Sequence, residues 1–299
     1  MRKQQPPWQA PSLQLTRCKL RRFTPEAARK CLEGRPLVMI GDSLTRYQYI
    51  ALIYFLEFGR WPAPLRGAAG HPSPVIASEW GPWSQFYQGT TTMFAGHQQC
   101  RCFRQDAFNA PEDRFYRNGN LSMTFYRWLG YPITPLAGHW GFPPFSNATQ
   151  CQPGACSADP DWQLPIQDGI REVIAKLKPH TLVLNAGLWR RNRTDWPTEL
   201  YDSIFEAGIK AVAPQGGQCV WKTTTLAQAG DLKVGRDRDA AAVAAAQRHG
   251  WLVTDAWGAT HAAKMQLGDG IYIDPAHYKG FVYTELNQLL LNTICPAHN

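Results

Sequence analysis

The stretch that organises the chain reads Val38-Met39-Ile40-Gly41-Asp42-Ser43-Leu44-Thr45-Arg46. The apolar run from Pro36 to Ile40 is typical of a buried strand, and residues 44–58 have the broad apolar face of a helix. Ser43 therefore lies on a tight strand-to-helix turn, where helix N-terminal amides can receive negative charge. Such a turn suits a nucleophile, although Asp42 or Ser43 could equally be a simple helix cap.

A second informative stretch, Asp274-Pro275-Ala276-His277, lies near the C-terminus. A nucleophilic serine needs a base, and the base needs a partner that fixes its tautomer. Asp274 and His277 can supply both, if the fold brings them to Ser43. The alternative is a helix cap and a surface histidine. Asp255, at the end of another predicted strand, is the rival acid, and we rank it below Asp274 because Asp274 is in register with His277.

The composition of the chain limits which kinds of function we expect. The 299 residues suffice for a large core, and the formal net charge of +8 is spread along the chain. There is no dense Lys/Arg run and no nucleic-acid motif, so we expect a generally basic surface and no nucleic-acid partner. The eight cysteines do not have the spacing of a two-pair zinc site, and we predict no metal.

The cysteines and glycosylation sequons indicate an oxidising compartment. Sequons begin at Asn120, Asn147 and Asn192. Our preferred local disulfide is Cys151–Cys156, and Cys219–Cys295 could tie a strand to the final helix. The sequence contains no recognisable signal peptide or membrane span, so we expect the Golgi lumen or the cell exterior, with any targeting segment outside this sequence.

The first half of the chain divides into unequal parts. We predict an irregular lead-in over residues 1–30, with a short helix from Thr24 to Cys31, and a single catalytic domain over 31–299. Residues 60–164 are rich in Pro, Gly and aromatics, and we predict an inserted minor lobe there with a strand at 121–128. Some of its aromatic side chains either stack on sugar rings or simply pack the lobe: Trp80, Trp83, Phe86, Tyr87 and Trp140.

After Pro165 the pattern becomes regular. Helices are predicted at 166–177, 198–212, 237–249 and 278–292, and strands at 181–184, 218–222 and 251–254. This alternation predicts a three-layer α/β/α fold with a central parallel sheet. Sites in such sheets form beyond the carboxyl ends of the strands. Asn185 follows one strand directly and could donate an N–H to an oxyanion, or it could be a turn residue.

Three blocks together resemble the SGNH/GDSL hydrolase-like superfamily, and more narrowly its trichome birefringence-like and PC-esterase branch. The blocks are Gly41–Gln48, Leu184–Trp189 and Asp274–His277. The resemblance implies a three-layer fold and O-acetylation of polysaccharides in the secretory pathway. It also implies that Ser43 is the nucleophile, His277 the base and Asp274 the residue that orients it.

The same resemblance suggests further site residues. Asn185 and the Ser43 backbone N–H would hold the oxyanion, and Gly187 belongs to the same block. Arg46 lies about one helical turn beyond Ser43 and would stabilise charge there, unless it forms a surface salt bridge. The predicted substrate-binding residues are Trp189, Tyr47 and Tyr278.

Our leading hypothesis is a carbohydrate O-acetyltransferase that works through an acetyl-Ser43 intermediate. Its acceptor would be a glycan, and its donor acetyl-CoA or an acetylated carrier, with no bound cofactor. The first alternative is a carbohydrate acetyl esterase with the same triad, in which water attacks the acyl-enzyme. The second is a non-catalytic glycan-binding protein on the same scaffold.

Overall fold

The computed structural model describes residues 20–62, 114–128, 165–172, 174–186, 196–229 and 232–295, with the backbone alone at 127 and over 232–238. Its six-stranded sheet has the order β2-β3-β1-β4-β5-β6. All neighbouring strands are parallel except the β2–β3 pair. The strands are β1 (Leu37–Gly41), β2 (Arg114–Asn118), β3 (Leu121–Arg127), β4 (Thr181–Leu184), β5 (Gln218–Lys222) and β6 (Leu252–Thr254).

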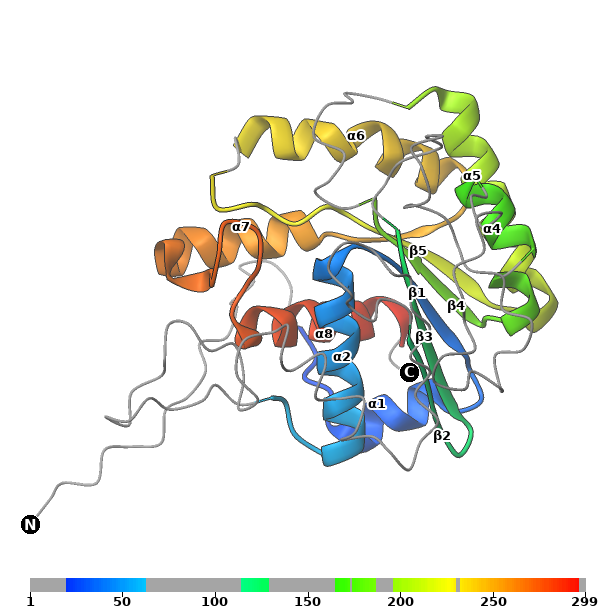
Figure 1. Cartoon of the computed structure of the whole chain (residues 1–299), viewed down its shortest axis with the longest axis horizontal. Helices are drawn as coiled ribbons and strands as arrows, with labels where there is room; N and C mark the ends of the chain where they lie inside the picture. The colour runs from blue at the N-terminus through cyan, green and yellow to red at the C-terminus, as the bar shows by residue number, and fades with distance from the viewer. Residues whose placement is uncertain are drawn as a thin grey trace, which may run out of the picture.

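Helices cover both faces of this sheet (Figure 1). One layer holds α1 (Pro25–Leu32), α2 (Ser43–Phe58), α7 (Ala256–Leu267) and α8 (Gly280–Ile294). The other holds α4 (Ile166–Glu172), α5 (Thr198–Val212) and α6 (Leu232–Arg248). Short 3-10 segments are η2 (Ile174–Leu177), η4 (Ala213–Gln215) and η5 (Gly268–Ile271). The predicted three-layer α/β/α architecture is confirmed.

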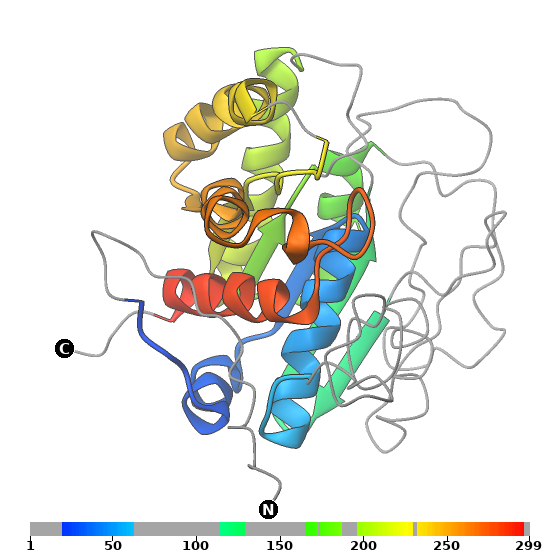
Figure 2. The same ribbon diagram turned by 90° about the vertical axis from the view of Figure 1, so that its left-hand side faces the viewer.

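Strand β1 shows why the sheet is buried on both sides. Side chains alternate along a strand, so Leu37 and Met39 pack in the core under α2 and α8, while Val38 and Ile40 pack in the core under α4 and α5. All four are buried. A strand between two helical layers needs apolar residues on both faces, which accounts for the continuous apolar run in the sequence. Figure 2 shows α2 and α8 together on one side of β1.

Several elements differ from the sequence prediction. The expected helix at 166–177 is two segments, α4 and η2, and the last helix begins at Gly280 rather than Tyr278. Strand β2 and helix α7 were not expected. Strand β2 joins β3 through a two-residue turn, where Gly119 has φ of +60°. Helix α7 begins after Asp255, whose Oδ1 accepts the Gly258 N–H at 2.8 Å as a cap.

Residues 20–36, the described part of the chain before β1, contribute to the core. Phe23 is buried, and its backbone N–H donates to Gln288 Oε1 of α8 at 2.8 Å. Arg22 forms an ion pair with Glu285 of the same helix at 2.7 Å. Helix α1 contributes Ala28 and other buried side chains to the same layer. The segment from residue 20 onward therefore packs with the domain that follows it.

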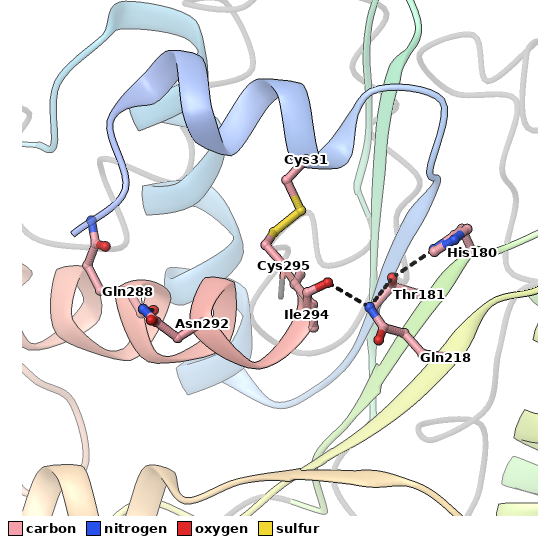
Figure 3. Close-up of a disulfide and its surroundings, with 8 residues drawn as sticks. All are labelled: Cys31, His180, Thr181, Gln218, Gln288, Asn292, Ile294 and Cys295. Atoms are coloured by element: carbon pink, nitrogen blue, oxygen red, sulfur yellow. Dashed lines mark hydrogen bonds between the residues drawn. A yellow bond between two sulfur atoms is a disulfide. The ribbon is translucent and has the colours of Figure 1, made fainter. Parts of the chain in front are cut away.

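A disulfide joins Cys31, in α1, to Cys295 at the end of α8 (Figure 3). Nearby, Gln218 Nε2 donates to the Ile294 carbonyl at 2.9 Å and so links α8 to β5. The predicted Cys219–Cys295 bond is wrong, because Cys219 points into the α5/α6 layer while Cys295 packs in the opposite one. Cys219 is a buried free thiol. A disulfide agrees with the expected oxidising compartment.

Parts of the prediction concern residues outside the described ranges. These are Cys151, Cys156, Asn147, Asn192 and the aromatic residues proposed to stack on sugars. The remaining sequon residue, Asn120, is exposed on the β2–β3 turn. No helix within the described ranges combines the length and apolar character needed to cross a bilayer.

Candidate active site

The Ser43 turn forms where β1 meets α2. Asp42 is the helix cap, and its Oδ1 accepts the Leu44 N–H at 3.0 Å. Because Asp42 performs the capping, the Ser43 hydroxyl is directed elsewhere, at the first position of the helix. Ser43 is half-buried at the carboxyl end of β1. The cap interpretation therefore holds for Asp42, and the role of Ser43 as a nucleophile stays a prediction.

Ser43, His277 and Asp274 form two successive side-chain contacts. The distance from Ser43 Oγ to His277 Nε2 is 2.7 Å, and that from His277 Nδ1 to Asp274 Oδ2 is 2.8 Å. An ionised carboxylate can only accept, so Nδ1 carries the proton in this pair. Nε2 is then the unprotonated nitrogen, and it faces the serine hydroxyl. This arrangement allows His277 to take the Ser43 proton.

The carboxylate of Asp274 is held by its own loop. Its Oδ1 accepts the backbone N–H groups of Ala276 and His277, at 2.9 and 2.8 Å. Partial burial alone would raise the pKa of Asp274, but the hydrogen bonds from these amides and from His277 outweigh it, so the pKa lies below its usual value. Asp274 is therefore ionised near neutral pH and can stabilise a protonated His277.

The loop that carries His277 is braced by the segment after β5. The Tyr272 hydroxyl donates to the Leu226 carbonyl at 2.9 Å, and the Tyr278 hydroxyl donates to the same carbonyl. The Gln228 N–H donates to the Pro275 carbonyl at 3.0 Å. Tyr278 is completely buried, so the prediction that it binds substrate is corrected: its ring packs in the core and supports the loop.

Tyr47 lies beside His277, and Arg46 contacts Tyr47. The Tyr47 ring meets the His277 imidazole edge-on, with centroids 5.1 Å apart. Arg46 Nη2 donates to the Tyr47 hydroxyl at 3.2 Å, and its guanidinium lies 4.9 Å from the centre of that ring. Tyr47 is only 5% exposed, so its contact with His277 indicates support of the base rather than a wide sugar-binding surface. Arg46 brings positive charge close to His277 through Tyr47, and its role in stabilising charge during a reaction stays a prediction.

Asn185 lies at the neighbouring strand end. Its backbone N–H donates to the Ile40 carbonyl at 2.9 Å, which places it beside the end of β1. Its side-chain Nδ2 donates to the Lys222 carbonyl at 2.8 Å, which fixes the amide and uses one of its two N–H bonds. Gly187 and Trp189, also predicted site residues, are outside the described ranges.

Sequence reasoning missed Lys222, and it ranked Asp255 below Asp274 as the partner of His277. Lys222 ends β5, and its buried Nζ donates to Thr45 Oγ1 at 3.2 Å. A lysine at the carboxyl end of an otherwise apolar strand was the available signal. Asp255 caps α7 and accepts the Thr223 hydroxyl at 3.3 Å, while Asp274 occupies the position next to the base. The described residues contain no cluster of three or more side chains suited to bind a metal ion.

Comparison with known proteins gives structural likeness only. No family model and no curated protein matches the chain. An alpha/beta hydrolase from the metagenome of Lake Arreo, Spain, is similar, with 14% identity and a TM-score of 0.42, covering 88% of this chain and 95% of that one. An acetylxylan esterase from Geobacillus stearothermophilus has 13% identity and a TM-score of 0.40, covering 90% and 97%. A lipase/acylhydrolase from Enterococcus faecalis has 14% identity and a TM-score of 0.40, covering 87% and 95%. Identity this low assigns no activity to the chain.

Proposed function

We propose that the protein is a serine esterase that removes acetyl groups from carbohydrates through an acetyl-Ser43 intermediate. The observation that supports this most directly is the unbroken line from Ser43 Oγ through His277 to Asp274, with contacts of 2.7 and 2.8 Å. The carbohydrate and the acetyl group come from the resemblance of the three sequence blocks.

The first half-reaction forms the acyl-enzyme. Ser43 Oγ attacks the ester carbonyl carbon while His277 Nε2 takes the hydroxyl proton. Negative charge develops on the carbonyl oxygen, near the N-terminus of α2 and the amide of Asn185. When the tetrahedral intermediate collapses, the C–O bond to the sugar breaks and His277 gives its proton to the departing sugar oxygen. Ser43 is left acetylated.

The second half-reaction decides between hydrolysis and transfer. In an esterase, water attacks the carbonyl carbon of acetyl-Ser43 while His277 takes a proton from the water. The bond between the acyl carbon and Ser43 Oγ then breaks, acetate leaves, and His277 returns a proton to Ser43 Oγ. The side chains of His277 and Asp274 are 23% and 46% exposed, so solvent can reach the base. This exposure favours hydrolysis as the reaction that the site supports best.

A second candidate function is O-acetyl transfer to a glycan hydroxyl, and the sequence blocks favour it. Here a sugar hydroxyl replaces water in the second step, and acetyl-CoA or an acetylated carrier would supply the acetyl group. For either reaction, the proposed compartment is the Golgi lumen or the cell exterior, which the Cys31–Cys295 disulfide supports.

Labelling of Ser43 and product analysis test these proposals together. A fluorophosphonate should modify wild-type protein at Ser43, and the Ser43→Ala variant should not react. Ser203→Ala is a matched control, because Ser203 lies on α5 with its hydroxyl donating to the Leu200 carbonyl at 2.9 Å. It should react like wild type. Failure of Ser43 to react, with no acetate released from acetylated glycans, would refute the enzyme and leave glycan binding as the alternative.

Acetyl-labelled donors distinguish the two reactions. Wild-type protein is incubated with acetylated glycans, or with labelled acetyl-CoA and unlabelled glycans, and the products are analysed by mass spectrometry. Free acetate as the sole labelled product supports the esterase. Label on sugar, formed faster than free acetate, would replace the esterase with the transferase.

A further inference from the structure

A lysine is buried directly beneath the Ser43 turn. Lys222 is the last residue of β5 and shares a face of that strand with Val220, so it points toward the layer that contains α2. Its side chain is only 1% exposed, and Nζ donates to Thr45 Oγ1 of α2 at 3.2 Å. A charged group in such a position costs free energy unless it is paired, so its presence calls for a specific reason.

The charge that faces Lys222 comes from the Ser43 turn. Asp42 is buried, caps α2 and attracts the ammonium group electrostatically. The strands on either side of Lys222 present Asn185 and Thr254, which carry no charge. On α8, Tyr283 lies within the influence of Asp42, and burial raises the pKa of its phenol, which keeps it neutral. Asp42 is therefore the charged partner of Lys222 among the described residues.

Lys222 also holds the neighbouring strand end. Its backbone carbonyl accepts the Asn185 side-chain N–H at 2.8 Å, while its ammonium group contacts α2 through Thr45. The two groups proposed to flank the oxyanion, the start of α2 and the Asn185 amide, are thus connected through one residue. A movement of Lys222 would displace both of them.

We propose that Lys222 is a positioning residue for acyl transfer at Ser43, and that its ammonium charge holds the turn through Asp42 and Thr45. This inference rests on the proposed function. Lys222 touches neither the reacting atoms nor His277 in the described contacts. It acts on the reaction through the position of Ser43 and through the positive potential that it adds behind the developing oxyanion.

Lys222 loses its positive charge at mildly alkaline pH. Burial lowers its pKa to about 8, against the opposing effect of Asp42. As pH rises through this value, the ammonium becomes a neutral amine and its attraction to Asp42 is lost. A general base must be unprotonated to act, and this requirement limits the rate on the acidic side only. Lys222 then supplies a second, alkaline limit on the rate.

The test compares three variants by the pH dependence of p-nitrophenyl acetate hydrolysis, from about pH 6 to 10. Lys222→Met removes the charge at similar length, and Thr45→Val removes the hydroxyl acceptor at similar volume. Lys210→Met is the matched control, because Lys210 is 72% exposed on α5. Circular dichroism and fluorophosphonate labelling of Ser43 monitor folding and the site.

We expect Lys222→Met to lower kcat about 10- to 100-fold with little change in KM, and to lack the alkaline limit. Thr45→Val should move that limit to lower pH, because the ammonium loses an acceptor. Lys210→Met should match wild type. If the Lys222→Met variant does not fold, the Thr45→Val variant provides the test. An alkaline limit at the same pH as in wild type would then overturn the inference.

Other outcomes separate this inference from the proposed function. If the Lys222→Met variant still loses activity at the same alkaline pH as wild type, whatever its overall rate, then another group causes that loss. Lys222 would then have only a packing role. Wild-type protein that neither reacts at Ser43 nor turns over would refute the esterase itself, and the role of Lys222 with it.

Discussion

Replacing Gly41 with alanine is expected to displace Ser43, the proposed nucleophile. The added methyl carbon would lie 2.4 Å from Thr45 Oγ1 and 2.8 Å from Thr45 Cβ, whereas ordinary contacts begin at 3.4 Å. The difference, 3.4 − 2.4, requires a shift of about 1 Å. Thr45 is fully buried and accepts a hydrogen bond from Lys222, so it cannot simply turn away. The first turn of α2, which begins with Ser43, must move instead.

The size of the effect follows from the contact that would be lost. Ser43 Oγ lies 2.7 Å from His277 Nε2, and a displacement of about 1 Å along that line would bring the separation to about 3.7 Å, beyond hydrogen-bond length. A misplacement of this size costs on the order of 10²-fold in rate. Overpacking a buried site costs about 1–3 kcal/mol in the free energy of unfolding. Gly41→Ala should therefore reduce activity far more than its modest loss of stability explains.

The assay combines kcat/KM for p-nitrophenyl acetate with urea unfolding. Gly270→Ala is the matched control, because a methyl group there would meet nothing within 4 Å. Adding Thr45→Ala to Gly41→Ala removes the 2.4 Å contact but leaves the one at 2.8 Å, so recovery should be partial. Wild-type kcat/KM and urea midpoint in Gly41→Ala would refute the reasoning.

Three further predictions concern the triad and the disulfide. Ser43→Ala should lower kcat on the order of 10⁴-fold or more with an unchanged urea midpoint, and retained turnover would contradict its role as nucleophile. Asp274→Asn should also reduce kcat by about 10⁴-fold. Because the pKa of Asp274 in the folded protein lies below its ordinary value, wild type should lose a stabilising contribution as pH falls through the acidic range where this carboxylate takes up a proton, and thermal melts of Asp274→Asn should depend less on acid pH. Reduction of Cys31–Cys295, which are separated by 264 residues, should destabilise the protein by about 3–5 kcal/mol, whereas Cys219→Ala should keep the bond; equal urea midpoints with and without reductant would exclude this contribution.

The sequence predicted β1, β4 and β5 because these strands are buried between two helical layers and are correspondingly apolar, and it predicted β3 because apolar residues alternate along that strand. Strand β2 was missed because Arg114–Asn118 contains two arginines and an asparagine, and it lies at the sheet edge, where one side needs no strand partner. Helix α7 was missed because Asp255 was considered as an acid rather than as a cap, although a cap signal before helix-forming residues was present.

Some features of the candidate site depend on residues that are close in the sequence, and others depend on contacts that only the tertiary fold creates. The Asp274–His277 pairing is local, since Asp274 contacts the backbone only two and three residues onward, and a short motif can encode it. The position of Lys222 depends instead on the register of β4 with β5 and on the packing of α2. The pairing of Cys295 depends on which face of the sheet each cysteine reaches, and no local pattern records that.

The disulfide between α1 and the end of α8 has a consequence for folding during translation. Cys295 leaves the ribosome 264 residues after Cys31, and His277 follows Ser43 by 234 residues. During translation, α1 and α2 therefore emerge with their apolar faces uncovered, since α8 is the helix that packs against them. Such surfaces are recognised by chaperones. A nascent chain that ends before residue 277 carries Ser43 without His277, so the proposed ester chemistry needs nearly the whole chain to be made before it can begin.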